Sequence, residues 1–401
     1  MATTELSASL DLVHSQEELM LREAVAGICS GFGPEYMHRK VDAGEPPTEL
    51  WDALASRGFL GVNIAEEWGG GGLGIAALSW VAEEISAAGC SLLLIAVSPA
   101  IVGSILARHG SAEQKERWLR GIAAGTTKVA FAITEADAGS NSHRLSTSLR
   151  RDGSRFLLNG QKTYISAVEE ADAVLVVARS RLPDGTLGLP SLAIVDVDAT
   201  GFTRQQIPMP YIGPDHQWTL YFDDVELSED RLVGGENGGL GPIFDGLNPE
   251  RIMGASIVAG AARFALAKAA DYARERRVWD QPIGSHQGVA HPLAEAKIEL
   301  ELARLMTQKA AALSDAGAKG AGEASNMAKY AAAEAAIHCV DQAIQTHGGN
   351  GFALEYGLSQ RWWGVRLLRS APVSREMILN YVAEHSLGLP KSYGAGVGAK
   401  G

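Results

Sequence analysis

Two glycine-containing segments have the residue types that can hold a phosphate group. Gly69, Gly71 and Gly74 satisfy the spacing G-x-G-x-x-G, which binds a dinucleotide when it joins a strand to a helix in a β-α-β unit. Glu66 and Glu67 stand directly before these glycines, and no β-α-β pattern surrounds them. A pyrophosphate would meet negative charge here, so we expect no nicotinamide dinucleotide site at this segment.

The second segment runs from Thr134 to Ser140. Its Gly139-Ser140 pair would let the backbone approach a pyrophosphate more closely than larger side chains allow. Further along, Arg276 offers the positive charge that a pyrophosphate requires, and Trp279 offers a plane on which adenine can stack. Each feature also has an ordinary structural explanation. The loop could be a simple turn, Arg276 could be a solvated charge on a helix surface, and Trp279 could be a core aromatic residue.

Two glutamates have a sequence context that suits either catalysis or a helix start. Glu250 follows Pro249, and Glu376 follows Ser374, so each carboxylate could simply occupy the first turn of a helix, where the helix dipole favours it. Neither can be assigned to proton transfer from its immediate neighbours alone.

Histidines and cysteines form no pattern that would bind a metal. The histidines of the C-terminal half lack zinc-ligand spacing and a partnered nucleophile, and we interpret them as structural or as contacts at the edge of a cofactor; they are His286, His291, His338 and His347. The three cysteines are far apart in apolar contexts and are expected to be buried thiols in a reducing compartment; they are Cys29, Cys90 and Cys339. We predict no metal site and no disulfide.

The bulk composition describes an acidic globular protein of more than one domain. The 401 residues are 46% hydrophobic and 20% charged, with a formal net charge of -12. A single core stops growing below this length, so two or three domains are expected. The negative charge argues against nucleic acid and anionic membrane as partners. No signal-like segment opens the chain and no run of 18 apolar residues occurs, so we expect a cytoplasmic protein.

Hydrophobic periodicity changes twice along the chain. Helical spacing is found in five early segments, which are residues 21–28, 50–54, 76–85, 92–106 and 114–122. Short β-rich runs follow at 156–158, 163–165, 174–177, 192–197 and 219–222. Asn159-Gly160 lies between the first two runs and predicts a hairpin turn. After the glycine-rich loop 234–239 the helical period returns, with apolar stripes at Ile298, Leu302, Leu305 and Met306 and at Met377, Ile378, Tyr381 and Val382.

This order predicts an α+β protein that is mostly α. We expect an N-terminal helical domain at 1–128, a small β-domain with the ligand cleft at 129–240, a C-terminal four-helix bundle at 241–391 and a tail at 392–401.

Five motifs in this order resemble those of the acyl-CoA dehydrogenase family, and the resemblance runs from about Trp51 to Leu389. The motifs are residues 51–58 with 66–70, then 132–140, 160–166, 272–283 with Gln287, and 345–352. Ala136 stands where the family usually has proline. Each motif alone is moderately specific, whereas five in the right order and spacing identify the chain as a relative of this family.

The resemblance implies FAD as the cofactor. Its isoalloxazine ring needs hydrogen-bond donors and an apolar or aromatic wall, because the reduced ring is anionic. By resemblance, the middle segment contacts the cofactor through Phe131, Ile133 (backbone), Thr134, Gly139, Ser140, Tyr164 and Ser166. The C-terminal segment contributes Arg276, Trp279, Gln287, Gln345, Gly348 and Gly349. In the family this second group reaches FAD across a subunit boundary, so a homotetramer is implied.

The general base departs from the usual pattern of the family. A carboxylate must remove the α-proton of the thioester while the flavin takes the β-hydride from the opposite face. Counting from Gly348-Gly349 without a gap, the usual glutamate position falls on Pro372, which cannot accept a proton and lacks the N–H that the family uses to polarise the thioester carbonyl. Residues 247–251 instead resemble the branch with isovaleryl-CoA and long-chain dehydrogenases, whose base precedes this arginine. Glu250 is therefore the expected base, with Glu376 as a second candidate.

The resemblance also places residues at the substrate. Arg251 is expected to help hold the CoA arm, and Ser140, Ala371 and Pro372 are expected to line the acyl thioester. Ala371 replaces an aromatic residue, which suggests room for a branched or bulky acyl group. Acyl-CoA and an acyl carrier protein thioester both remain possible substrates. Residues 363–365 occupy the place of the family's Arg-Asp-Ala, and we have no interpretation for them.

The implied activity is the α,β-dehydrogenation of an acyl thioester, with hydride transfer to flavin N5 and electrons leaving to electron-transferring flavoprotein. Two alternatives stay open. The same fold could serve a flavin oxidase, monooxygenase or desulfinase, or the chain could be a non-catalytic partner that completes the FAD site of an active homologue.

Overall fold

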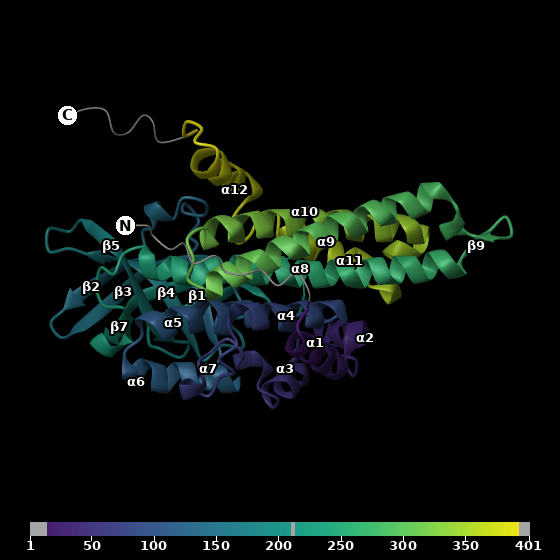
Figure 1. Cartoon of the computed structure of the whole chain (residues 1–401). Helices are drawn as coiled ribbons and strands as arrows, with labels where there is room; N and C mark the ends of the chain where they lie inside the picture. The colour runs from purple at the N-terminus through teal and green to yellow at the C-terminus, as the bar shows by residue number, and fades with distance from the viewer. Residues whose placement is uncertain (1–13, 210–212, 393–401) are drawn as a thin grey trace.

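The computed structural model describes residues 14–209 and 213–392, in which helices, then strands, then helices form three successive parts. A β-domain lies at one end, and long helices extend from it to a far end where β9 protrudes (Figure 1). The predicted tail at 392–401 lies outside the described residues except for Ser392.

The N-terminal part is helical, as its periodicity predicts. Its elements are α1 (Gln16–Cys29), α2 (Gly33–Ala43), α3 (Thr48–Ala55), α4 (Gly74–Ala87), the π-helical η3 (Ala96–Val102), α5 (Gly103–His109), α6 (Ala112–Gln114), the π-helical η4 (Lys115–Leu119) and α7 (Arg120–Ala124). Helix α4 is buried on most sides, and its N-terminus is capped from the C-terminal half: Ile75 and Ala76 donate their N–H groups to Asp315 at 2.7 and 2.9 Å. A carboxylate thus already occupies the helix end that follows the G-x-G-x-x-G spacing.

The middle part is one twisted sheet of mixed direction. Its strands are β1 (Val129–Ala132), β2 (Ser148–Asp152), β3 (Arg155–Ser166), β4 (Ala173–Arg181), β5 (Leu187–Asp196), β6 (Phe202–Ile207), β7 (Gln217–Ser228) and β8 (Leu232–Val233). The order is β6-β7-β3-β2-β4-β5-β8, and β1 pairs with β4 in parallel. The helical segment η3 packs against β1, so this strand lies beside the N-terminal helices.

The predicted hairpin turn at Asn159-Gly160 is wrong. Both flanking β-rich runs belong to the single strand β3, and the dipeptide forms a bulge where the register with β7 shifts. Gly160 is needed there because its φ is 143° and a Cβ would lie 2.7 Å from the Cα of Thr147. Asn159 holds the bulge through two hydrogen bonds to Asp224, at 2.8 and 3.0 Å. The turn that joins β2 to β3 is instead at Gly153-Ser154.

The C-terminal part consists of long helices with alanine-rich contacts. They are α8 (Gly241–Glu275), α9 (Gln287–Asp315), α10 (Ala321–His347), α11 (Leu358–Leu367) and α12 (Arg375–Tyr381), with a hairpin of β9 (Arg277–Val278) and β10 (Gln281–Pro282) between α8 and α9. These helices and the preceding two parts confirm the predicted α+β class with its three successive blocks. Ser374 caps α12 by accepting the Met377 N–H, as its sequence context suggested.

Helix α8 begins earlier than the sequence indicated. We expected a helix start at Pro249, but the helix begins at Gly241 with Pro242 in its first turn, and Pro249 lies buried in its interior. Glu250 is therefore not a first-turn residue, and the helix-start interpretation of this carboxylate is wrong. Among the described residues α8 alone is long and apolar enough to cross a membrane, but 72% of its most apolar window is buried in the fold.

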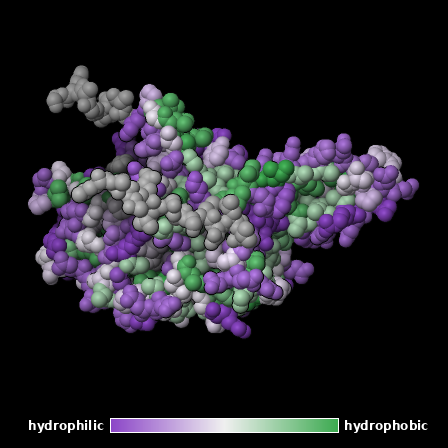
Figure 2. All heavy atoms as spheres, in the orientation of Figure 1, coloured by the Kyte–Doolittle hydropathy of each residue, from purple (hydrophilic) through white to green (hydrophobic). Residues whose placement is uncertain are grey.

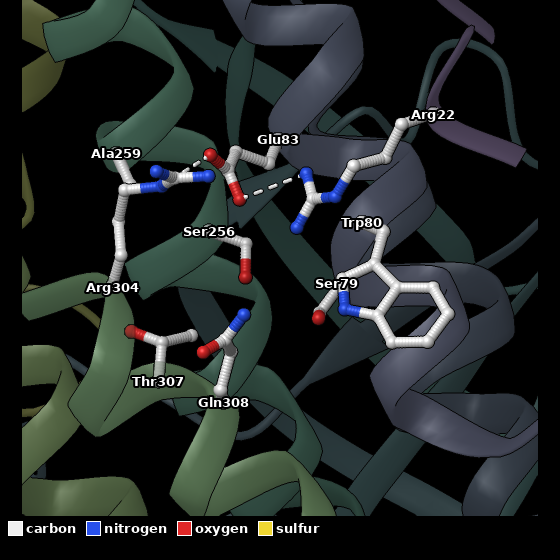
Figure 3. Close-up of a pocket in the computed structure, with 9 residues that line it drawn as sticks. All are labelled: Arg22, Ser79, Trp80, Glu83, Ser256, Ala259, Arg304, Thr307 and Gln308. Carbon is white, nitrogen blue, oxygen red and sulfur yellow. Dashed lines mark hydrogen bonds and ion pairs between the residues drawn. The ribbon is translucent and has the colours of Figure 1, made fainter. Parts of the chain in front are cut away.

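A buried ionic cluster joins the N-terminal helices to the long helices. Glu83 and Glu84 of α4 accept hydrogen bonds from Arg22 of α1, Arg263 of α8 and Arg304 of α9, at 2.6 to 3.2 Å. Both glutamates are 6% exposed. Figure 3 shows Glu83 between Arg22 and Arg304, beside a recess of only about 10 Å³. That volume holds about one water, so the recess is a structural junction rather than a ligand site.

We expect Glu83→Gln to lower the free energy of unfolding by about 3 kcal/mol, because it leaves buried guanidinium groups with too little negative charge. Urea denaturation followed by circular dichroism measures the change. Glu116→Gln, which removes the exposed partner of Arg120, is the control and should leave the midpoint unchanged. An unaltered midpoint for Glu83→Gln would show that the arginines find other partners.

Candidate active site

The loop after β1 is tied directly to the end of β3. The Thr163 N–H donates to the Thr134 carbonyl at 2.9 Å, so two segments that are distant in sequence lie side by side. Helix η3 packs against both β1 and α8, which brings this loop and the first half of α8 around the same element. The site is therefore assembled from all three parts of the chain.

A buried ion pair stabilises the loop from behind. Lys162, with no exposed surface, donates to Glu135 at 2.8 Å and to the Ile133 carbonyl at 2.9 Å. The other Glu135 oxygen accepts the N–H and hydroxyl of Ser146, both at 2.7 Å. Burial alone would raise the pKa of Glu135, but Lys162 and these hydrogen bonds lower it to about 2. The carboxylate is therefore ionised throughout the neutral range.

This ion pair also sets the direction of one peptide group. Because a trans peptide is planar, its N–H points away from its carbonyl. Lys162 holds the Ile133 carbonyl toward the interior, so the Thr134 N–H faces the opposite side, where it donates no hydrogen bond within the described part of the chain. Ile133 and Thr134 are half-buried, and Gly139 and Ser140 are exposed. The loop thus presents an unused donor next to an accessible backbone.

The end of β3 adds an aromatic ring and a hydroxyl. Tyr164 sits at a register shift with φ 56° and is 59% exposed, so its ring has little cover from its own chain. Two residues on, the Ser166 hydroxyl accepts from the Gln217 amide at 2.9 Å. A large ring held at positive φ is a strained arrangement of the kind that persists at binding sites.

Sequence reasoning gave no role to Lys162 or Gln217. Lys162 lies inside the motif at residues 160–166, so the sequence did indicate that this lysine stands close to the proposed cofactor site. Gln217 had no such indication, because its contact with Ser166 depends on the pairing of β3 with β7.

The predicted cofactor residues fall into two separate groups within one chain. Phe131, which is buried, lies with the other middle-segment residues in the β-domain. The second group gathers at the far end of the long helices, around the β9–β10 hairpin and the C-terminal end of α10 (Figure 1). All its members are exposed; they are Arg276, Trp279, Gln287, Gln345, Gly348 and Gly349. The structure does not bring the two groups together.

These exposed groups fit an extended cofactor with a planar ring at each end. Trp279 is 86% exposed, and Gly348 and Gly349 have no atom within 4 Å of where a Cβ would stand. Gly139 is equally open. Tyr164 and Trp279 supply uncovered aromatic faces, and the glycines leave the backbone accessible, which suits FAD if two chains contribute.

Glu250 lies on α8 among cations and apolar helices. Burial raises the pKa of its carboxyl to about 7, and the positive charges of Arg251 and Lys329 oppose this rise. Its side chain accepts no hydrogen bond among the described residues, whereas Arg251 donates to Asn248 at 2.8 Å. A carboxyl that is partly ionised near neutral pH and has no fixed partner can act as a general base.

The residues around Pro372 form the turn before α12. Ala371 is half-buried and Pro372 exposed, and the Val373 carbonyl accepts a hydrogen bond from Lys329 at 2.5 Å. The second candidate base, Glu376, has a side chain that is 71% exposed and lies near Arg375.

A cavity of about 400 Å³ adjoins the residues that precede Glu250. It lies between the N-terminal helices, α8 and the connection from α9 to α10. It is lined by Asn63, Ile64, Gly74, Ile75, Gly103, Ser104, Ala107, Arg108, Asp245, Asn248, Pro249, Ser314, Asp315, Gly317, Ala318, Gly320, Ala321 and Gly322. Small residues predominate, so the space is open rather than filled by side chains.

The order of helices, a mixed sheet and a second set of long helices is the three-domain architecture of acyl-CoA dehydrogenases. Family models agree: the acyl-CoA dehydrogenase N-terminal domain matches residues 15–126, the middle domain 130–225 and the C-terminal domain 237–387. The chain belongs to the acyl-CoA dehydrogenase family, a family of flavoprotein oxidoreductases. The predicted family is thereby confirmed.

Individual relatives are similar over nearly the whole chain. Acyl-CoA dehydrogenase FadE12 of Mycobacterium tuberculosis is 53% identical over 95% of this chain and 98% of its own. The caffeyl-CoA reductase-Etf complex subunit CarC of Acetobacterium woodii is 31% identical over 83% of this chain and 88% of its own. The structure of a glutaryl-coenzyme A dehydrogenase with glutaryl-CoA has a TM-score of 0.90 at 27% identity, covering 95% of this chain and 98% of that one.

We expect the Glu250 carboxyl to titrate with a midpoint near pH 7, far above the value of about 4 for exposed glutamates. Infrared difference spectra of protein labelled with ¹³C-carboxyl glutamate would measure it, and Glu250→Gln identifies the band by its loss. A band that titrates with the exposed glutamates would contradict the burial of this group.

Proposed function

We propose that this protein catalyses the FAD-dependent α,β-dehydrogenation of an acyl thioester, acting on a CH–CH bond with Glu250 as the base. The observation that carries the proposal is the half-buried carboxyl of Glu250, which desolvation and two nearby cations bring to a pKa of about 7 and which accepts no hydrogen bond among the described residues. Family membership supports FAD as the cofactor and acyl-CoA as the substrate, and an acyl carrier protein thioester has the same reacting group.

The described residues account for the proton side of the reaction. Bound FAD would supply the hydride acceptor. Glu250, when ionised, takes the α-proton, and its pKa near 7 means that both the ionised and protonated forms are accessible at neutral pH. In this proposal the Thr134 N–H and the Ser166 hydroxyl would hydrogen-bond the flavin, and Tyr164 would pack on its ring. Arg251, Ser140, Ala371 and Pro372 are assigned to the substrate.

We further propose electron-transferring flavoprotein as the acceptor. The name of the similar Acetobacterium woodii subunit shows that one relative works in a complex with such a protein. A cytoplasmic location is part of the same proposal and is supported by three buried free cysteines.

Glu250→Gln should abolish turnover, by at least about a thousandfold, while FAD stays bound, because an amide cannot accept the proton. Anaerobic bleaching of the flavin absorbance, with a panel of acyl-CoA thioesters, is the measurement. Glu376→Gln is the matched control and should bleach at the wild-type rate.

Three results would contradict the proposal in different ways. Full activity of Glu250→Gln would remove this residue from the mechanism. Rapid oxygen consumption without an added acceptor would favour the oxidase or monooxygenase alternative, and wild-type protein that binds no flavin would favour the non-catalytic partner.

A homotetramer is the assembly we propose, because one chain leaves its cofactor residues in two separate groups. An apolar stripe on α9 is available for a second copy: Ile298, Leu302 and Leu305 are 61%, 62% and 42% exposed. Their spacing predicted a stripe, and the structure places these three on the outer surface rather than in the helical core. Green patches along the long helices are visible in Figure 2.

Leu302→Asp should dissociate the assembly and reduce retained FAD at least tenfold, because a charge would be buried at the contact between copies. Light scattering after size-exclusion chromatography gives the mass, and the flavin-to-protein absorbance ratio gives the FAD content. Lys297→Asp, exposed on a different face of α9, is the control. An unchanged mass with full flavin would place the contact elsewhere.

A further inference from the structure

A lysine that none of the motifs contains is buried on α10, which packs against the helix that carries the proposed base. Lys329 of α10 is only 1% exposed. Among the described residues it donates a hydrogen bond to the Val373 carbonyl, at 2.5 Å, in the turn that leads into α12. A buried ammonium group has a high desolvation cost and is retained where it has a partner or a role.

The charges around Lys329 come from three helices. Glu250 and Arg251 of α8, Glu334 of α10 itself and Glu376 of α12 act on it. Arg251 and Lys329 are the charged groups that act on Glu250. Arg251 is partly committed to Asn248 and is adjacent to Glu250 in sequence, whereas Lys329 approaches from a different helix. The position of Lys329 relative to Glu250 is therefore decided by the packing of α10 on α8.

We propose that Lys329 is a positioning residue for the Glu250 base: its ammonium group holds the turn at Val373 against α10 and keeps a positive charge beside Glu250 in the interior. The expected effect of Lys329 on turnover rests on the proposed function. Its expected effect on the Glu250 pKa does not depend on that function. An ammonium has three donors, and the Val373 carbonyl uses one, so the group is fixed in place without being neutralised.

The physical effect has a definite sign. Without a nearby cation, a buried carboxyl is harder to ionise, and its pKa rises further. Lys329 therefore favours the ionised, proton-accepting form of Glu250. Its own pKa is lowered by burial and by Arg251 to about 8, so it carries its charge at neutral pH and loses it in mildly alkaline solution.

The test compares wild type, Lys329→Met and Lys329→Arg as FAD-bound holoenzymes. Infrared titration of labelled glutamate gives the Glu250 midpoint. Lys329→Met should raise it by about one pH unit, and Lys329→Arg should restore it. In flavin bleaching, the rate of Lys329→Met should fall about tenfold below pH 7 and approach wild type at high pH. Lys309→Met removes an exposed lysine of α9 and should change neither quantity.

A folded, flavin-containing Lys329→Met protein with the wild-type midpoint would overturn the inference. If this variant does not fold, the wild-type titration decides: the Glu250 band should shift a second time near pH 8, as Lys329 loses its proton, and a single step would overturn the inference. Should no thioester bleach the wild-type flavin, the proposed function fails, while a shifted midpoint in Lys329→Met would still support the role of Lys329.

Discussion

The partial desolvation of the Glu250 carboxyl is the constraint on which the proposed chemistry depends. In water this group would be fully ionised at neutral pH and a weak base. Desolvation among the helices that pack on α8 raises its pKa to about 7, and the positive charges of Arg251 and Lys329 keep the pKa from rising further. A pKa near 7 requires both desolvation of the carboxyl and a positive charge near it. Glu250 is on α8, whereas Lys329 is on α10. The long helices are thus the elements that set the basicity of the site.

Buried ionic contacts recur in the chain, both where the helical parts meet and inside the β-domain. Glu83 and Glu84 join α4 to α1, α8 and α9 through three arginines, and Asp315 caps α4 from the end of α9. Lys162 and Glu135 do the same inside the β-domain. A buried pair contributes little net stability compared with apolar packing, but an incomplete pair is costly. An arrangement of the helices or strands that breaks these ion pairs would therefore be strongly destabilised, although the intact pairs add little to the stability of the correct fold.

A single chain presents only half of each implied cofactor site. Thr134, Tyr164 and Ser166 lie in the β-domain, while Arg276 and Trp279 lie at the far end of α8 (Figure 1). A ring 86% exposed, such as that of Trp279, is an unfavourable surface for an isolated monomer. The length of α8, 35 residues, separates the groups, and the contribution of a second copy is our proposal for how one site obtains both.

The sequence by itself determined the family and the three successive blocks, and it named the candidate residues of the site. Periodicities of helix and strand are local properties, and five motifs in order are specific, so both can be read without coordinates. It failed where a local signal competes with tertiary pairing. Asn159-Gly160 predicts a turn, but β7 and Thr147 convert it into a bulge. Pro249 predicts a helix start, but buried packing carries α8 through it.

Only the tertiary structure decided how these residues act on one another. The sequence could propose Glu250 from its resemblance, but not the burial that raises its pKa, nor the approach of Lys329 from 79 positions further along the chain. The orientation of the Thr134 N–H likewise depends on a tertiary contact, in which Lys162 of β3 donates to the Ile133 carbonyl just after β1. The physical reason is the same in each case: desolvation and Coulomb interactions depend on distance in space, which the order of residues does not specify.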